Sequence, residues 1–109
     1  MAYDDGLAER IREIFNGSLD VEEKKMFGGL AFMVRGNMCC GVKDDLLMAR
    51  VGPEQYSKAL KRRHAREMDF TGKPLKGFIY VDTQGIENDR DLKLWVGLCQ
   101  GFVRSLPPK

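Results

Sequence analysis

Apolar residues near the N-terminus recur at the spacing of an α-helix. Between residues 7 and 15 they fall at positions i, i+4, i+7 and i+8, which form one stripe along a helix. The members of this stripe are Leu7, Ile11, Ile14 and Phe15. Acids at Asp4 and Asp5 suit the positive end of the helix dipole, and Asn16-Gly17 is a typical stop. The pattern therefore predicts a first helix that ends near residue 17.

The composition changes between residues 24 and 51, where Val, Phe, Met and Leu dominate. Gly36-Asn37 and Asp44-Asp45 interrupt this stretch, and both are turn-forming pairs. We expect three antiparallel strands, near residues 24–35, 38–43 and 46–51, that are joined by these two-residue turns.

The second half of the chain predicts two more helices and two more strands. Pro53 opens a short helix that ends in the basic run 61–63, because proline is favoured in a first helical turn. A short strand near 66–70 and a clearer strand at 77–81 follow. A strong amphipathic helix comes last, and Pro107-Pro108 ends it. Its apolar positions are Leu92, Trp95, Val96, Cys99, Phe102, Val103 and Leu106.

These elements predict an α+β fold in the order α-β-β-β-α-β-β-α. We expect a two-layer arrangement in which a five-stranded antiparallel sheet carries the helices on one face. At 109 residues the chain is long enough for one hydrophobic core, and no repeat or linker divides it. Residues 1–109 are therefore predicted to form a single domain.

The two predicted turns decide which strand residues share a face of the sheet. One face is wholly apolar and should meet the helices. It holds Ala31, Met33, Met38, Cys40, Val42, Leu47, Ala49 and Val51. The other face is mixed, and its excess of apolar residues makes it a candidate interaction face. Its large apolar residues are Leu30, Phe32, Val34, Leu46 and Met48. The same register buries Cys40 opposite Ala49. It exposes Cys39 opposite Arg50 on the open face.

Charge is distributed unevenly, although the net charge is only +2. Residues 58–76 carry seven Lys or Arg against two acids, a balance of +5, so the rest of the chain carries −3. Such a region is a candidate for phosphate or nucleic-acid contact, and a solvated helix end is the alternative. The candidate contacts are Lys58, Lys61, Arg62, Arg63, Arg66, Lys73 and Lys76.

The sequence contains no segment typical of secretion or membrane insertion. Its N-terminus is acidic, unlike a signal peptide, and no apolar run approaches the roughly 20 residues of a membrane span. We therefore expect a cytoplasmic protein without a membrane partner.

Metal, cofactor and catalytic motifs are not found either. The three cysteines form no CxxC spacing, and Cys39-Cys40 on a strand should point to opposite faces, which disfavours one shared metal. Free thiols are expected, with a redox-responsive Cys39 as the alternative. The single histidine, His64, has no recognisable catalytic partner. We expect no metal, no cofactor and no enzymatic activity.

Two pairs of glycines raise separate questions. Gly28-Gly29 lies inside an apolar run without a phosphate-binding motif, so it predicts a bend in the first strand. A ligand that approaches the bare backbone there is the alternative. Gly97 and Gly101 lie in the last predicted helix, where each costs about 1 kcal/mol relative to Ala. Close packing of that helix on the sheet is the expected compensation, and a helix dimer seam is the alternative.

Several stretches of the sequence resemble a known family. They read KKMFGGLAF, MCCGV, VGPEQY and MDFTGKPLKGFIYVD. Over nearly its whole length the chain resembles the N-terminal domain of TfoX, also called Sxy, a bacterial regulator of competence for DNA uptake. The most specific parts are Lys25-Met26-Phe27-Gly28-Gly29 and the stretch from Met68 to Phe78. The resemblance implies the same order of helices and strands, and it supplies no catalytic residues.

The resemblance and the candidate interaction face together lead to one main hypothesis. The chain is expected to be a regulatory, protein-interaction module that binds a protein partner or itself through the open face of the sheet. Full-length competence regulators carry a further helical C-terminal domain, and this sequence ends soon after its last predicted helix. The first alternative is nucleic-acid binding through residues 58–76, and a weaker one is small-molecule binding at the glycine bend.

Overall fold

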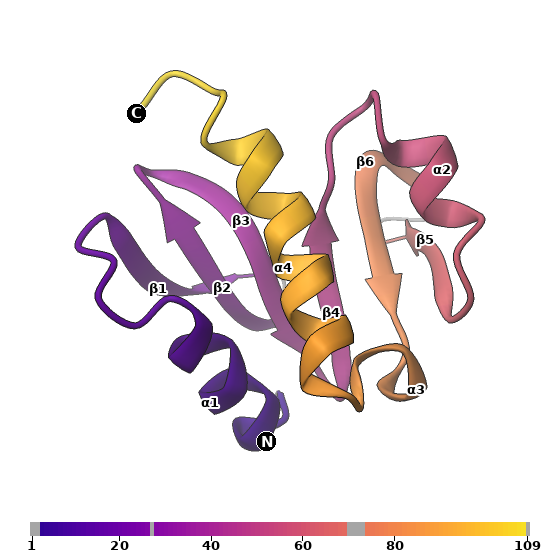
Figure 1. Cartoon of the computed structure of the whole chain (residues 1–109), viewed down its shortest axis with the longest axis horizontal. Helices are drawn as coiled ribbons and strands as arrows, with labels where there is room; N and C mark the ends of the chain where they lie inside the picture. The colour runs from indigo at the N-terminus through magenta and orange to yellow at the C-terminus, as the bar shows by residue number, and fades with distance from the viewer. Residues whose placement is uncertain (1–2, 27, 70–73, 109) are drawn as a thin grey trace.

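The computed structural model shows helices packed on one antiparallel sheet (Figure 1). It describes residues 3–26, 28–69 and 74–108. The helices are α1 (Asp5–Ile14), α2 (Tyr56–Leu60), α3 (Thr83–Ile86) and α4 (Asp89–Val103). The strands are β1 (Val21–Met26), β2 (Gly29–Val34), β3 (Asn37–Lys43), β4 (Leu46–Arg50), β5 (Ala65–Asp69) and β6 (Pro74–Val81).

Side-chain caps explain where the two long helices begin. The Asp4 carboxylate accepts hydrogen bonds from the backbone N–H groups of Gly6, at 2.9 Å, and Leu7, at 3.2 Å. The Asn88 side chain accepts one from the backbone N–H of Arg90 at 2.8 Å. The predicted first and last helices are therefore confirmed as α1 and α4. Within the described residues, no helix combines the length and apolar character that a membrane crossing needs.

The sheet has the strand order β1-β2-β3-β4-β6-β5, and every neighbouring pair is antiparallel. The α+β class is confirmed, but the prediction of five strands is wrong because the sheet has six. The expected strand 24–35 is a hairpin of β1 and β2, in which Met26 lies opposite Gly29. β1 lies at the edge of the sheet, and its residues 22–25 are charged and exposed. It therefore lacks the apolar alternation that marks a half-buried strand.

Gly28 lies in the turn of this hairpin and Gly29 begins β2, so the prediction that the pair bends one continuous strand is wrong. Gly28 has a φ of +76°, in the left-handed region that other residues rarely adopt. A Cβ atom on Gly29 would collide with the carbonyl oxygen of Val42 on β3. Gly28 therefore permits the backbone conformation of the turn, and Gly29 permits the close approach of β2 to β3.

The turn between β2 and β3 lies one residue earlier than predicted. It consists of Arg35-Gly36, with φ values of +53° and +84°, instead of Gly36-Asn37. The other predicted turn, Asp44-Asp45, is confirmed because Lys43 lies opposite Leu46. Moving a two-residue turn by one position changes which residues lie opposite each other but keeps the same side chains together on each face. The exchange of faces relative to the prediction arises instead at an irregularity in the pairing of β2 with β3.

A β-bulge then turns both neighbouring cysteines into the same core. Phe32 on β2 lies opposite Cys40 on β3. The next paired residues are Met33 and Met38, so Cys39 is the extra residue of the bulge. Cys40 is buried, as predicted, whereas the prediction of an accessible Cys39 is wrong because its exposed fraction is 0%.

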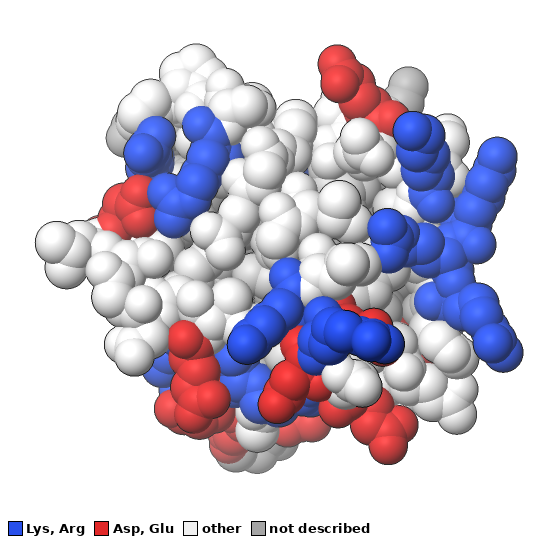
Figure 2. All heavy atoms as spheres, in the orientation of Figure 1, with Lys and Arg blue, Asp and Glu red and all other residues white. Residues whose placement is uncertain are grey.

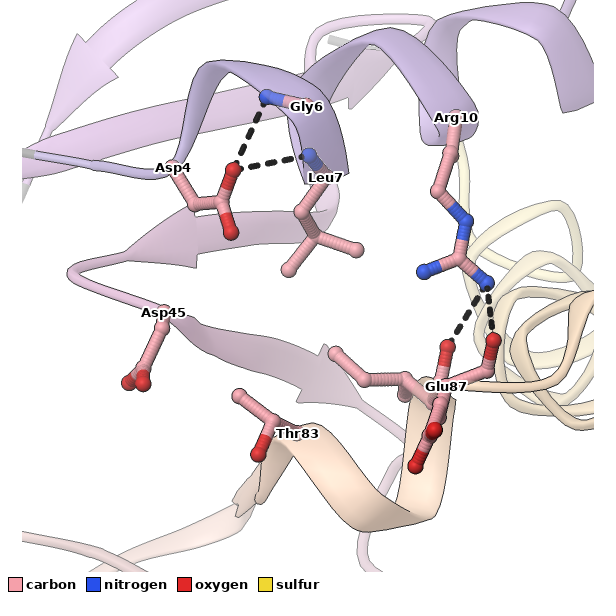
Figure 3. Close-up of a pocket in the computed structure, with 8 residues that line it drawn as sticks. Asp4, Gly6, Leu7, Arg10, Asp45, Thr83 and Glu87 are labelled. Carbon is pink, nitrogen blue, oxygen red and sulfur yellow. Dashed lines mark hydrogen bonds between the residues drawn. The ribbon is translucent and has the colours of Figure 1, made fainter.

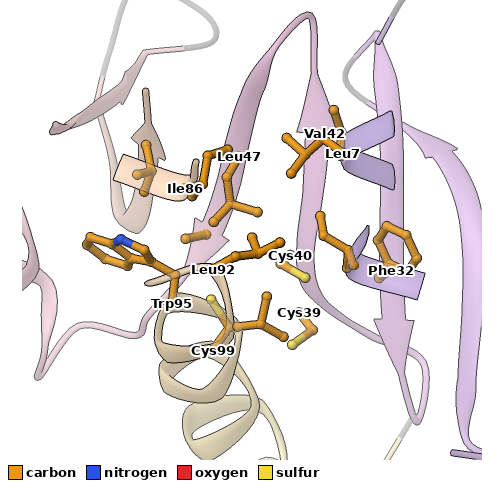
Figure 4. Packing of buried hydrophobic residues seen from close by; sticks show 14 of the residues in the cluster. Leu7, Phe32, Cys39, Cys40, Val42, Leu47, Ile86, Leu92, Trp95 and Cys99 are labelled. Atoms are coloured by element: carbon orange, nitrogen blue, oxygen red, sulfur yellow. The ribbon is translucent and has the colours of Figure 1, made fainter. Parts of the chain in front are cut away.

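The main hydrophobic core joins the helices to one side of the sheet (Figure 4). Its helical residues include Leu7, Ile11, Ile86, Leu92, Trp95, Val96 and Cys99. Its strand residues include Leu30, Phe32, Val34, Cys39, Cys40, Val42, Leu47 and Ala49. The placement of Leu30, Phe32 and Val34 on an open face is therefore wrong, since the extra residue of the bulge puts the faces of β2 in a different relation to the rest of β3.

A second buried cluster is formed by strand residues alone, within the described part of the chain. It contains Ala31, Met33, Met38, Met48, Met68 and Tyr80. Ala31, Met33 and Met38 were expected in the helix-facing core, and the bulge at Cys39 accounts for this error as well. Met48 is fully buried, and Leu46 is half-buried. None of the five residues proposed for the interaction face is thus exposed.

Candidate interaction surfaces

A basic patch covers α2 and the start of β5. We define it as Lys58, Lys61, Arg62, Arg63 and Arg66, and all five residues are exposed. Figure 2 shows Lys and Arg side chains gathered over this side of the molecule. The structure therefore brings together five of the seven predicted nucleic-acid contacts. Lys73 and the side chain of Lys76 lie outside the described residues.

Two cations of the basic patch already have partners within the chain. The Arg62 guanidinium carbon lies 5.3 Å from the centre of the Trp95 ring, and the Arg66 Nη2 lies 3.5 Å from Asp82 Oδ1. His64 is half-buried, and its carbonyl accepts a hydrogen bond from the backbone N–H of Asp82 at 2.8 Å. The backbone of His64, with a φ of +70°, makes the sharp turn from α2 into β5.

The second surface is a groove between α4 and the segment that precedes α2. We call it the α4 groove; its volume is about 550 Å³. Its apolar floor consists of Leu94, Gly97, Leu98, Gly101 and Phe102. Leu94 is 47% exposed, and Leu98 and Phe102 are half-buried. This region supplies apolar surface that the folded chain leaves in contact with water.

The two glycines in α4 face solvent from the floor of the groove. Both are exposed, and a Cβ atom added to Gly97 or Gly101 would meet no heavy atom within 4 Å. The prediction that they permit close packing of the helix on the sheet is therefore wrong. Each glycine costs the helix about 1 kcal/mol relative to Ala, and the described fold offers no packing that compensates for this cost.

The α4 groove is basic at one end and acidic at the other. Near the N-terminal half of α4, Lys93 and Arg62 line it, and Arg62 is held there by its contact with Trp95. At the opposite end Glu54 lines it. Gly52, two residues before Glu54, lies against the Phe102 ring, which places this segment near the C-terminus of α4.

A polar pocket of about 440 Å³ lies where α1, α3 and the β3–β4 turn meet (Figure 3). Arg10 crosses one side of it, and its Nη2 donates to the carbonyl oxygens of Ile86, at 2.7 Å, and Glu87, at 3.2 Å. The Asp4 carboxylate on the other side caps α1. The residues described here include no cluster of three or more His, Cys, Asp or Glu that could hold a metal ion. We assign these polar groups to structural hydrogen bonds.

The three cysteines lie together in the core between β3 and α4 (Figure 4). Cys39, Cys40 and Cys99 are free thiols and are all buried. A hydrogen bond with Cys39 and burial together raise the pKa of Cys40, and burial raises the pKa of Cys99. Because the thiolate is the reactive form, the Cys40 and Cys99 thiols are held in an inert state.

Comparison with known families identifies the class to which this fold belongs. The model of the TfoX N-terminal domain matches residues 13–102. The chain therefore belongs to the TfoX N-terminal domain family, and the predicted resemblance is confirmed. Neither the curated proteins nor the solved structures contain a match to this chain.

Gly97 and Gly101 were predicted to face the sheet, whereas the structure shows that both face solvent. Leu94, Gly97, Leu98 and Gly101 follow one another at steps of three and one, which is a second stripe beside the buried one. This stripe was visible in the sequence, but the strong apolar pattern of α4 concealed it. A helical wheel that separates the two stripes would have placed both glycines away from the core.

Proposed function

We propose that this protein is a regulatory module without catalytic activity that acts by binding another protein chain through the α4 groove. Family membership supports a TfoX-like module. The observation that carries the proposal is the pair of solvent-facing glycines in the groove floor, beside the exposed side chain of Leu94. A partner that packs against this floor would supply the close contact that the fold itself does not give to Gly97 and Gly101.

In this proposal one part of the molecule supports the fold and another part binds the partner. The sheet and the buried faces of the helices form a two-layer scaffold, and the outward face of α4 binds the partner. This chain resembles the N-terminal domain of bacterial competence regulators. A similar role in transcriptional regulation in the cytoplasm would use the outward face of α4 to hold another component of the regulatory system.

The experiment is affinity capture from an extract of the source cells, with partners identified by mass spectrometry. Leu94→Asp should remove the captured proteins, because a carboxylate would be desolvated against the apolar floor. The matched control is Leu19→Asp, since Leu19 is fully exposed and lies outside the groove. If Leu94→Asp captures the same proteins as the wild type, the groove is not the binding surface.

A second candidate function is nucleic-acid binding, and the clustering of the basic patch favours it. Lys58, Lys61 and Arg63 are exposed, and the structure shows them in no ion pair with another described residue. Phosphate binding by such a patch predicts an affinity that falls steeply as salt rises. Absence of binding to any RNA or DNA at about 50 mM salt would exclude this function.

The test of the basic patch compares two double variants. One reverses two charges within the patch, and the control reverses two charges on β1. Lys61→Glu together with Arg63→Glu should abolish binding. Lys24→Glu together with Lys25→Glu on the edge strand β1, where both side chains are also exposed, should leave it largely intact. Equal losses in the two double variants would indicate an effect of net charge and not of the basic patch.

A further inference from the structure

The floor of the α4 groove has the shape that a second copy of the same helix requires. Leu94, Gly97, Leu98 and Gly101 occupy positions i, i+3, i+4 and i+7 of α4, so they share one face. Two bulky side chains thus alternate with two positions that carry no side chain. A surface of this kind complements itself when a copy of the helix runs in the opposite direction.

We infer that the partner in the α4 groove is a second copy of this chain, related by a two-fold axis that passes α4 between Gly97 and Leu98. In this antiparallel arrangement Leu98 of each copy lies over Gly97 of the other. Leu94 of each copy likewise lies over Gly101 of the other. The inference rests on the proposed function of the groove and names its occupant.

The charges at the ends of the groove favour the same arrangement. The two-fold axis brings the basic end of one copy, with Arg62 and Lys93, to the acidic end of the other, with Glu54. Each contact occurs twice, because the interface of a two-fold dimer is the same patch on both copies. A parallel arrangement would instead place like charges together and leucine against leucine, which is unfavourable at both ends.

The size of the groove indicates a small interface. Leu94 and Gly101 are seven residues apart, or about 10 Å along the helix, and the flanking segment at Glu54 adds only a narrow rim. Interfaces of this size fall at the low end of the range for specific complexes. The dimer should therefore dissociate on dilution, and a concentration series is needed to observe it.

The test is sedimentation velocity of the purified chain over a concentration series, with a charge exchange. Glu54→Lys alone and Lys93→Glu alone should each weaken dimerisation by about tenfold, because each places like charges at both ends of the interface. The double variant Glu54→Lys/Lys93→Glu should recover most of the dimer. Both side chains are exposed, so these changes should not disturb folding.

A second variant tests the shape of the interface independently of charge. Gly97→Gln/Gly101→Gln introduces good helix formers that fill the positions opposite the leucines, and it should abolish the dimer while the monomer remains folded. The control Leu19→Asp should dimerise as the wild type does. A wild type that stays monomeric over the whole series would overturn the inference, as would a double charge variant no better than the single ones.

The outcomes separate this inference from the proposed function. If the wild type is monomeric but Leu94→Asp still loses the proteins captured from the extract, the groove binds a different protein and self-pairing is wrong. If Leu94→Asp affects neither dimerisation nor capture, the groove has no binding role and both proposals fail.

Discussion

The fold requires glycine at two positions in the sheet and does not require it at two positions in α4. A Cβ atom on Gly29 or on Gly41 would strike the backbone of a neighbouring strand; from Gly41 the carbonyl oxygen of Leu30 would be 2.5 Å away. A Cβ atom on Gly97 or Gly101 would meet nothing within 4 Å. Glycine is therefore required by the sheet, whereas α4 would fold better without it. Packing within the described fold therefore does not explain the glycines of α4, and the proposed binding surface gives them a role.

The largest effect is expected in the sheet. Gly29→Ala should destabilise the protein by more than about 3 kcal/mol, because the strands must move apart to accept the methyl group. Denaturant unfolding followed by circular dichroism measures this change. A loss below 1 kcal/mol would show that β2 and β3 yield easily, and the contrast between the two glycine pairs would disappear.

The same substitution in α4 should have the opposite sign. Gly97→Ala and Gly101→Ala should each stabilise the isolated monomer by about 1 kcal/mol, because alanine favours the helical backbone and space for its methyl group is open. Unfolding at low protein concentration is the appropriate measurement. Destabilisation by either change would mean that this face of α4 is packed within the monomer.

The buried thiols report whether the core behind α4 stays closed in these variants. Cys39, Cys40 and Cys99 should resist a thiol reagent in the native protein and should react together once the protein unfolds globally, since all three are buried in one cluster. Gly97→Ala should slow the reaction, and Gly29→Ala should accelerate it. Rapid labelling of Cys39 in the native wild type would contradict the bulge that buries it.

The smallest effect concerns an ion pair that holds the C-terminus of α4 to the start of β1. A hydrogen bond from Arg104, whose Nη1 lies 2.8 Å from Asp20 Oδ2, lowers the pKa of Asp20 below its ordinary value of 3.8. A carboxyl group with a lowered folded-state pKa stabilises the protein above the unfolded pKa, and this contribution is lost as pH falls through the folded value.

Asp20→Asn should therefore reduce the loss of stability in the acid range below pH 3.8 and have little effect on the slope near neutral pH. Thermal unfolding of the wild type and the variant at a series of acid pH values measures this pH dependence of stability. Identical slopes below pH 3.8 would show that the pairing of Asp20 with Arg104 does not persist in solution.

The sequence predicted elements whose signals are local and strong. The stripe of α1, the apolar face of α4 and the Asp44-Asp45 turn were all read correctly, because each depends on residues close together in the chain. The edge strand β1 was merged with β2 because its exposed, charged residues do not alternate with apolar ones. Edge strands receive their hydrogen bonds from one neighbour only, and apolar pattern is a weak guide to them.

The candidate site was harder to predict, since it depended on a register that a single residue can reverse. The extra residue at Cys39 exchanged the faces of β2 relative to Cys40 and Val42 and removed the proposed interaction face. This bulge is decided by pairing across the sheet and leaves no local signal. The basic patch could be predicted because its five residues lie in one short stretch, where chain proximity alone brings them together.

The most direct test of the account is the thermal unfolding midpoint of two chains over a range of protein concentrations. If the glycine face of α4 serves binding, the midpoint of the wild type should rise with concentration, because association stabilises the folded state. The midpoint of Gly97→Gln/Gly101→Gln should be higher at the lowest concentration and should not change with concentration. Equal dependence on concentration in both chains, or a lower midpoint for the variant in dilute solution, would contradict the claim that these glycines serve binding and not folding.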